Sequence, residues 1–95
     1  GDLYPCHQFV GQDEFKIGTV REGLVNTELS NAYKDSHVLN KPTCKSCWAK
    51  YYCSGGCHAN NLKYAGSFLE PFEISCVMER KRLECAFYIQ ASLAE

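Results

Sequence analysis

The sequence contains no apolar run that approaches the length of a membrane-spanning helix, and no signal peptide can be recognised at its start. The first residue is a glycine that need not be a native start, so this says little about the compartment. The net charge is only -1, with basic and acidic residues spread throughout the chain. This balance argues against a protein that binds nucleic acid or a membrane surface through bulk charge.

Signals of familiar catalytic chemistry are also lacking. The sequence has no paired-carboxylate site and no glycine-rich phosphate loop. We therefore expect no catalysis from this chain alone.

The length of 95 residues suits one small domain covering residues 1–95. A chain of this size buries little apolar surface, so a metal or disulfides often supply the stability that the core lacks. The seven cysteines are the unusual feature of the composition, and their odd number fits poorly with a closed set of disulfides.

Four of the cysteines form the run Cys44-x2-Cys47-x5-Cys53-x3-Cys57. Such crowding is easy for thiolates that share a metal centre and strained for disulfides between close neighbours. Cys44 and Cys47 are close enough to bind two irons of one cluster, and Cys53 can reach a third. Cys57 could complete that cluster or point to another. The spacing predicts an iron–sulfur site.

Zinc is the main rival, because the two cysteine pairs could make a tetrahedral four-thiolate site. The gap of five residues is short compared with the dozen or more between zinc-finger pairs, and zinc would leave Cys6 and Cys76 unused. Iron–sulfur is therefore favoured over zinc, and a disulfide framework is the least favoured alternative.

The pattern predicts an α+β fold of irregular loops. Gly1-Asp2 reads as a hairpin turn before a strand that continues to Gly11, which suggests a partial N-terminal hairpin whose first strand precedes the chain. Asn26 or Thr27 is expected to cap a helix that ends at Lys41-Pro42. Residues 43–57 are expected to form a loop, with Gly55 and Gly56 allowing it to wrap closely around a cluster.

One long helix is expected from about Ile74 to Ala94, with two nearly opposite apolar stripes. Two stripes indicate that one face packs on the cysteine loop and the other on something outside the chain. The first stripe comprises Cys76, Leu83, Phe87, Ala91 and Ala94, and the second comprises Ile74, Met78, Cys85 and Ile89.

The segment from Cys44 to Cys57 resembles the core of the SPASM domain of radical S-adenosylmethionine (SAM) enzymes. That family's pattern includes Gly-x4-Cys, then Cys-x2-Cys-x5-Cys-x3-Cys, then one further cysteine. Gly1-x4-Cys6 matches the first part, the run matches the middle, and Cys76 matches the last. The chain lacks the Cys-x3-Cys-x2-Cys run that binds the SAM-cleaving cluster in this superfamily.

The resemblance implies two auxiliary [4Fe–4S] clusters. The second would be held by Cys44, Cys47, Cys53 and Cys76, and the first by Cys6 and Cys57 with an upstream ligand. SAM and a third [4Fe–4S] cluster would belong to a radical SAM catalytic domain of the same chain. The other implied partner is a cysteine-containing precursor peptide, without nucleic acid or membrane, in the cytoplasm of an anaerobic bacterium.

The segment Tyr4-Pro5-Cys6-His7-Gln8-Phe9-Val10-Gly11 is similar in sequence to maturases of the "six cysteines in forty-five" (ranthipeptide) class. These enzymes form cysteine thioethers in ribosomally made peptides. In that class the first auxiliary cluster can have an open iron site. Anaerobic sulfatase maturases share the domain and are the nearest alternative. A zinc-binding interaction module and a free-standing ferredoxin-type electron carrier remain open.

Several residues near the cysteines carry less specific expectations. Cys85 is expected to be a small buried apolar side chain, with a stray cluster ligand as the alternative. His7 and His58 are expected at the surface or hydrogen-bonded near a ligand. The aromatic residues of the run should shield a cluster from water, and the lysines should either offset its charge or lie in solvent. The aromatic residues are Trp48, Tyr51 and Tyr52, and the lysines are Lys41, Lys45 and Lys50.

Overall fold

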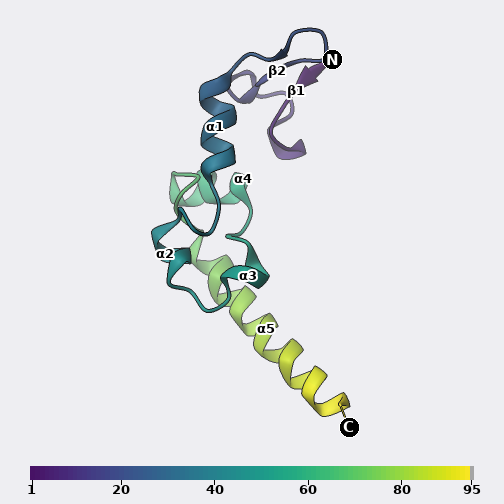
Figure 1. Cartoon of the computed structure of the whole chain (residues 1–95), viewed down its shortest axis with the longest axis vertical. Coiled ribbons are helices and arrows are strands. Elements are labelled where there is room, and N and C mark those ends of the chain that lie inside the picture. Colours follow the sequence, from purple (N-terminus) through teal and green to yellow (C-terminus); the bar gives the residue numbers. More distant parts are fainter. Residues whose placement is uncertain (95) are drawn as a thin grey trace.

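The computed structural model describes residues 1–94 and has an elongated shape, with extents of 55 × 26 × 20 Å. Its radius of gyration is 16.5 Å, whereas a compact domain of this length has about 12 Å. A small sheet lies at the end that holds the N-terminus, and the helix α5 extends to the opposite end (Figure 1). Within residues 1–94, no helix combines the length and the apolar composition needed to cross a membrane.

Buried side chains are few and are as often polar as apolar. The buried apolar residues in the described chain are Phe9, Cys44 and Ala49, and the buried polar ones are Ser36, Lys41 and Asn61. The accessible surface is 6789 Å², compared with about 5500 Å² for a compact monomer of this mass. A small apolar core therefore leaves much of the stability of this fold to polar contacts and to any group bound at the cysteines.

The sheet has three antiparallel strands in the order β1-β2-β3: β1 Asp2–Leu3, β2 Gly18–Thr19 and β3 Gly23–Leu24. Leu3 pairs with Gly18, which pairs on its other side with Leu24. A Cβ on Gly18 would lie 1.9 Å from the carbonyl oxygen of Gly23, so the central strand requires glycine there.

The predicted hairpin turn at Gly1-Asp2 is wrong. Asp2 lies in β1 and pairs with Thr19, downstream in the sequence. The predicted strand to Gly11 is also wrong, because residues after Leu3 turn into the 3-10 helices η1 His7–Phe9 and η2 Asp13–Phe15. Burial of Phe9 drives this compact arrangement: its ring lies 4.4 Å from that of Phe15 and 6.2 Å from that of Phe68.

Helix α1 spans Thr27–Asp35, and its N-cap is Asn26, whose side chain accepts a hydrogen bond from the backbone N–H of Leu29 at 3.1 Å. The predicted end at Lys41-Pro42 is wrong. The chain leaves the helix at Ser36, whose hydroxyl donates to the carbonyl oxygen of Phe68 at 2.6 Å. Pro42 instead begins a new helix, α2 Pro42–Lys45, a position where its missing N–H costs nothing.

The cysteine segment 43–57 is partly helical rather than wholly irregular. It contains the end of α2 and the short helix α3 Lys50–Cys53. The helices α4 His58–Asn60 and η3 Asn61–Ala65 follow directly. In space, α4 lies between α1 and the short helices of the cysteine segment (Figure 1).

The long helix α5 spans Glu73–Leu93, which confirms the prediction to within one residue at each end. Its first stripe contacts the cysteine segment, because the ring of Phe87 lies 6.3 Å from that of Trp48 and 5.2 Å from that of Tyr52. The second stripe is solvent-exposed, with Ile74 and Ile89 at 61% and 56% exposure. A three-stranded sheet with short helices and one long helix confirms the α+β class.

Candidate functional site

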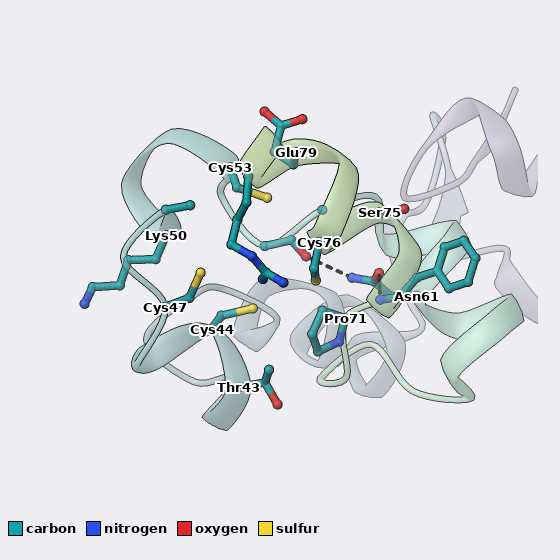
Figure 2. Close-up of a pocket in the computed structure, with 15 residues that line it drawn as sticks. Thr43, Cys44, Cys47, Lys50, Cys53, Asn61, Pro71, Ser75, Cys76 and Glu79 are labelled. Atoms are coloured by element: carbon teal, nitrogen blue, oxygen red, sulfur yellow. Dashed lines mark hydrogen bonds between the residues drawn. The ribbon is translucent and has the colours of Figure 1, made fainter. Parts of the chain in front are cut away.

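A pocket lies where α2, α3 and the turn after α3 meet the start of α5 (Figure 2). Its volume of about 60 Å³ exceeds the about 10–15 Å³ that one water molecule needs. The space between these segments is therefore hollow rather than packed. Its lining residues include Thr43, Pro71, Phe72, Ser75 and four cysteines.

The four cysteines in the pocket are Cys44, Cys47, Cys53 and Cys76. Cys44 belongs to α2, Cys53 ends α3, and Cys76 lies in the first turn of α5. Their sulfurs surround one space in Figure 2. These are the residues predicted to hold the second auxiliary cluster, and the fold brings all four to one pocket although the last is far from the others in sequence.

The thiols in this pocket are partly desolvated. Burial raises the pKa of Cys44, while the nearby ammonium of Lys41 acts in the opposite direction. Burial likewise raises the pKa of Cys76, and the guanidinium of Arg80, which also lines the pocket, opposes that effect. Two cations therefore lie beside thiols that would carry negative charge once they bind a metal.

The turn after α3 has three consecutive residues with positive φ, and its two glycines line the pocket. The three residues are Ser54, Gly55 and Gly56, with φ angles of 62°, 93° and 81°. The carbonyl oxygen of Gly55 accepts two hydrogen bonds, from Nζ of Lys41 at 3.1 Å and from Nδ2 of Asn61 at 3.0 Å. The glycine pair thus forms a tight turn at the pocket, and its wrapping around a cluster stays a prediction.

Cys6 and Cys57 lie outside this pocket, and both lie near Tyr33. Burial raises the pKa of Tyr33, and the nearby thiols of Cys6 and Cys57 raise it further. The side-chain nitrogen of Gln8 lies 3.9 Å from the sulfur of Cys57. The fold thus places the two cysteines predicted for the first auxiliary cluster around one tyrosine, apart from the other four.

The chemistry of the pocket fits a cluster that is bound by thiolates. Four sulfurs lie around a hollow that is lined mostly by apolar atoms, and iron in a cubane cluster takes one thiolate per iron. Among residues 1–94, no three histidine, cysteine or acidic side chains converge on a position for a single metal ion. The ligand assignment itself stays a prediction.

The exposed positions of several side chains correct the sequence expectations. Cys85 is exposed on α5, so its predicted burial is wrong. The predicted shielding by aromatic rings is also wrong, because Trp48, Tyr51 and Tyr52 are 53%, 74% and 64% exposed. None of the three lines the pocket: Tyr51 and Tyr52 belong to α3, and Trp48 precedes that helix.

The histidines and lysines near the cysteines differ in their exposure to solvent. His7 is exposed, whereas His58 stacks on Tyr33 at 4.3 Å between ring centroids and contacts the carbonyl oxygen of Ser36 at 2.8 Å. Lys45 is exposed, and Lys41 is fully buried beside the cysteine pocket.

Three residues of this region were not singled out by the sequence. Asn61 joins Gly55 to the backbone N–H of Phe72 through two hydrogen bonds of 3.0 Å. Tyr33 lies near Cys6 and Cys57, and Arg80 lies one turn after Cys76 on α5. The helical spacing of Cys76 and Arg80 was the one available signal, because side chains four apart share a helix face.

No family model matches this chain. The chain is 34% identical over an alignment of 64 residues to a cysteine-type anaerobic sulfatase-maturating enzyme of Clostridium novyi (strain NT), and the alignment covers 63% of this chain. The aligned part is 17% of that enzyme, so the chain spans about a sixth of the relative that it matches. The chain is therefore similar to one part of a maturase.

Proposed function

We propose that this chain is the auxiliary iron–sulfur domain of a radical SAM maturase. One observation carries the proposal: four cysteines from α2, α3, the loop between them and α5 line a single hollow pocket. Thiolates delivered from loops and helix ends in this way suit a cubane cluster. The similarity to a part of a sulfatase-maturating enzyme supports the same reading from a separate direction.

In this proposal the pocket cysteines hold one [4Fe–4S] cluster. Cys6 and Cys57 hold a second with at least one ligand from outside the chain, and their position around Tyr33 supports this pairing. The catalytic domain of the parent enzyme, with SAM and a third [4Fe–4S] cluster, is the proposed partner. A bound cluster would supply a site for one-electron transfer.

The proposed substrate is a cysteine-bearing segment of a protein or peptide. Its modification as in cysteine-type sulfatase maturation is favoured by the sequence similarity. Formation of a cysteine thioether in a ribosomally made peptide is the second candidate, and it is favoured by the sequence of the segment from Tyr4 to Gly11. In both cases the domain would position the substrate and pass electrons.

Anaerobic reconstitution of the full-length protein tests the cluster proposal. We expect a brown protein whose iron and sulfide content falls by one cluster in Cys76→Ser. The matched control is Cys85→Ser, because this cysteine lies on the same helix but is exposed outside the pocket. A colourless protein that binds one zinc would overturn the proposal, as would equal iron content in wild type and Cys76→Ser.

Two substrates separate the candidate reactions. The full-length enzyme with SAM and a reductant is incubated with a sulfatase-type cysteine peptide or with a cysteine-rich precursor peptide, and products are identified by mass. Oxidation of the cysteine in the first peptide supports sulfatase maturation, whereas a crosslink in the second, with a loss of two hydrogens, supports thioether formation. If neither peptide changes while the clusters are intact, both substrate proposals are wrong.

A further inference from the structure

Lys41 is the only charged side chain with no solvent exposure among residues 1–94. It precedes α2 directly, and its backbone carbonyl oxygen accepts a hydrogen bond from the N–H of Lys45 at 2.8 Å. Its side chain passes under the turn after α3. Burying an ammonium without a compensating charge costs several kcal/mol, so the surroundings of Lys41 should contain negative charge.

The described chain provides no carboxylate for this purpose. The ion pairs among residues 1–94 use the acids Asp2, Glu79 and Glu84, and none of them involves Lys41. The acceptor within hydrogen-bond distance is the carbonyl oxygen of Gly55, at 3.1 Å, which is neutral. An ammonium has three donors, so one carbonyl oxygen leaves Lys41 incompletely satisfied.

The groups that can supply the missing charge are the pocket thiols. Burial lowers the pKa of Lys41, and the thiols of Cys44, Cys53 and Cys76 act against this by favouring the charged amine. These are three of the four cysteines that line the pocket. The wall between Lys41 and the pocket is the Gly55 backbone, where a Cβ would approach Nζ to 2.8 Å.

We propose that Lys41 is the buried counter-ion of the cluster held by Cys44, Cys47, Cys53 and Cys76, and that its charge raises the reduction potential of that cluster. This inference rests on the proposed function. Uptake of one electron adds negative charge to a cluster that is already anionic, and a fixed cation behind the Gly55 wall favours the reduced form. Cluster potentials depend on net charge, hydrogen bonds to sulfur and solvent exposure.

The two other lysines near the pocket are less suited to this role. Lys45 is exposed, so water screens its charge. Lys50 lines the pocket edge, but its ammonium donates to the carbonyl oxygen of Lys45 at 3.1 Å and is partly solvated. Lys41 is thus a positioning and charge-balancing residue that donates to Gly55 at the wall of the thiol-lined pocket.

The test is an EPR-monitored redox titration of the reconstituted full-length protein, with dithionite as the reductant. In Lys41→Met, which keeps the side-chain length and removes the charge, we expect one resolved cluster signal to move to a more negative potential while the others stay. The matched control is Lys45→Met, which should leave every signal in place. Unchanged potentials in Lys41→Met with full iron content would overturn the proposal.

A second variant is needed if Lys41→Met binds no cluster during reconstitution. Lys41→Arg retains the charge, so recovery of iron content in this variant, together with loss in Lys41→Met, supports a role for charge. Loss in both variants would overturn the proposal, because the shape of lysine would then matter more than its charge. If the wild-type protein itself holds no cluster, the proposed function fails, which is a separate and visible outcome.

Discussion

Asn61 and Gly55 are joined by a buried hydrogen bond of 3.0 Å from the asparagine Nδ2 to the glycine carbonyl oxygen. The Oδ1 atom of the same asparagine accepts the backbone N–H of Phe72 at 3.0 Å, just before α5 begins. One side chain with 1% exposure therefore ties the wall of the cysteine pocket to the helix that brings Cys76. These two hydrogen bonds hold the pocket wall and the helix together, a role that a larger apolar core plays in other domains.

Replacing this bridge should destabilise the domain. In Asn61→Ala, the backbone groups of Gly55 and Phe72 lose a buried partner, which costs about 1–3 kcal/mol for each group left unsatisfied. We expect a lower unfolding midpoint and slower cluster loading, measured by circular dichroism and by iron content after reconstitution. Asn31→Ala, at an exposed position on α1, is the control and should leave both quantities unchanged. Equal stability of the two variants would contradict the assigned bridge.

Gly55 should tolerate a methyl group less well than another glycine with a similar backbone. Both Gly55 and Gly66 have positive φ, at 93° and 80°, so each alanine variant carries a conformational cost of about 1–2 kcal/mol. The alanine Cβ at position 55 would also lie 2.8 Å from Nζ of Lys41, whereas nothing lies within 4 Å at position 66. Gly55→Ala should therefore unfold at lower denaturant concentration than Gly66→Ala and bind less iron. The same loss in both would show that the contact with Lys41 has little effect.

The cysteines of the metal-free, reduced protein should differ in their rates of alkylation. Burial raises the pKa of Cys44 and Cys76, so fewer of these thiols are ionised at pH 8, and the thiolate is the reactive form. We expect mass-mapped labelling to be slower at these two residues than at the exposed Cys85, with the difference narrowing as the pH rises and more thiolate forms. Uniform labelling at pH 8 would contradict the buried pocket. In the cluster-loaded protein, Cys85 should be the cysteine that still reacts.

The cysteine spacing predicted the candidate site better than the local patterns predicted the fold. Cys76 was assigned with the run 44–53 through the resemblance, and the structure places it in the same pocket. Local signals were less reliable where tertiary contacts decide. Burial of Phe9 turns a strand-like segment into η1, and the contact of Ser36 with Phe68 ends α1 before Pro42.

Burial of Lys41 could not be predicted for a different reason. Three lysines lie near the cysteines in the sequence, and nothing in their local pattern distinguishes them. The distinction arises from the turn with three positive φ angles, which places the carbonyl oxygen of Gly55 above Lys41. Periodicity carries no information about such a contact between positions fourteen residues apart in an irregular segment.

Tyr33 provides the test for the other pair of cysteines. Its pKa is raised by burial and then by the nearby thiols of Cys6 and Cys57, the two proposed ligands of the first cluster. The ring also stacks on His58 and lies 5.8 Å from the ring of Phe68, contacts that Tyr33→Phe retains.

A hydroxyl beside a ligand sulfur is placed to donate to it and so to stabilise the more negative, reduced form of the cluster, so removing the hydroxyl should lower the potential of that cluster. In the titration by EPR, Tyr33→Phe should move one signal to a more negative potential, and this signal should differ from the one that responds to Lys41→Met. Tyr64→Phe is the control, since that tyrosine is exposed and stacks on Phe72 instead. If both substitutions moved the same signal, the division of six cysteines into two centres would be wrong, because one cluster would then be in contact with both residues.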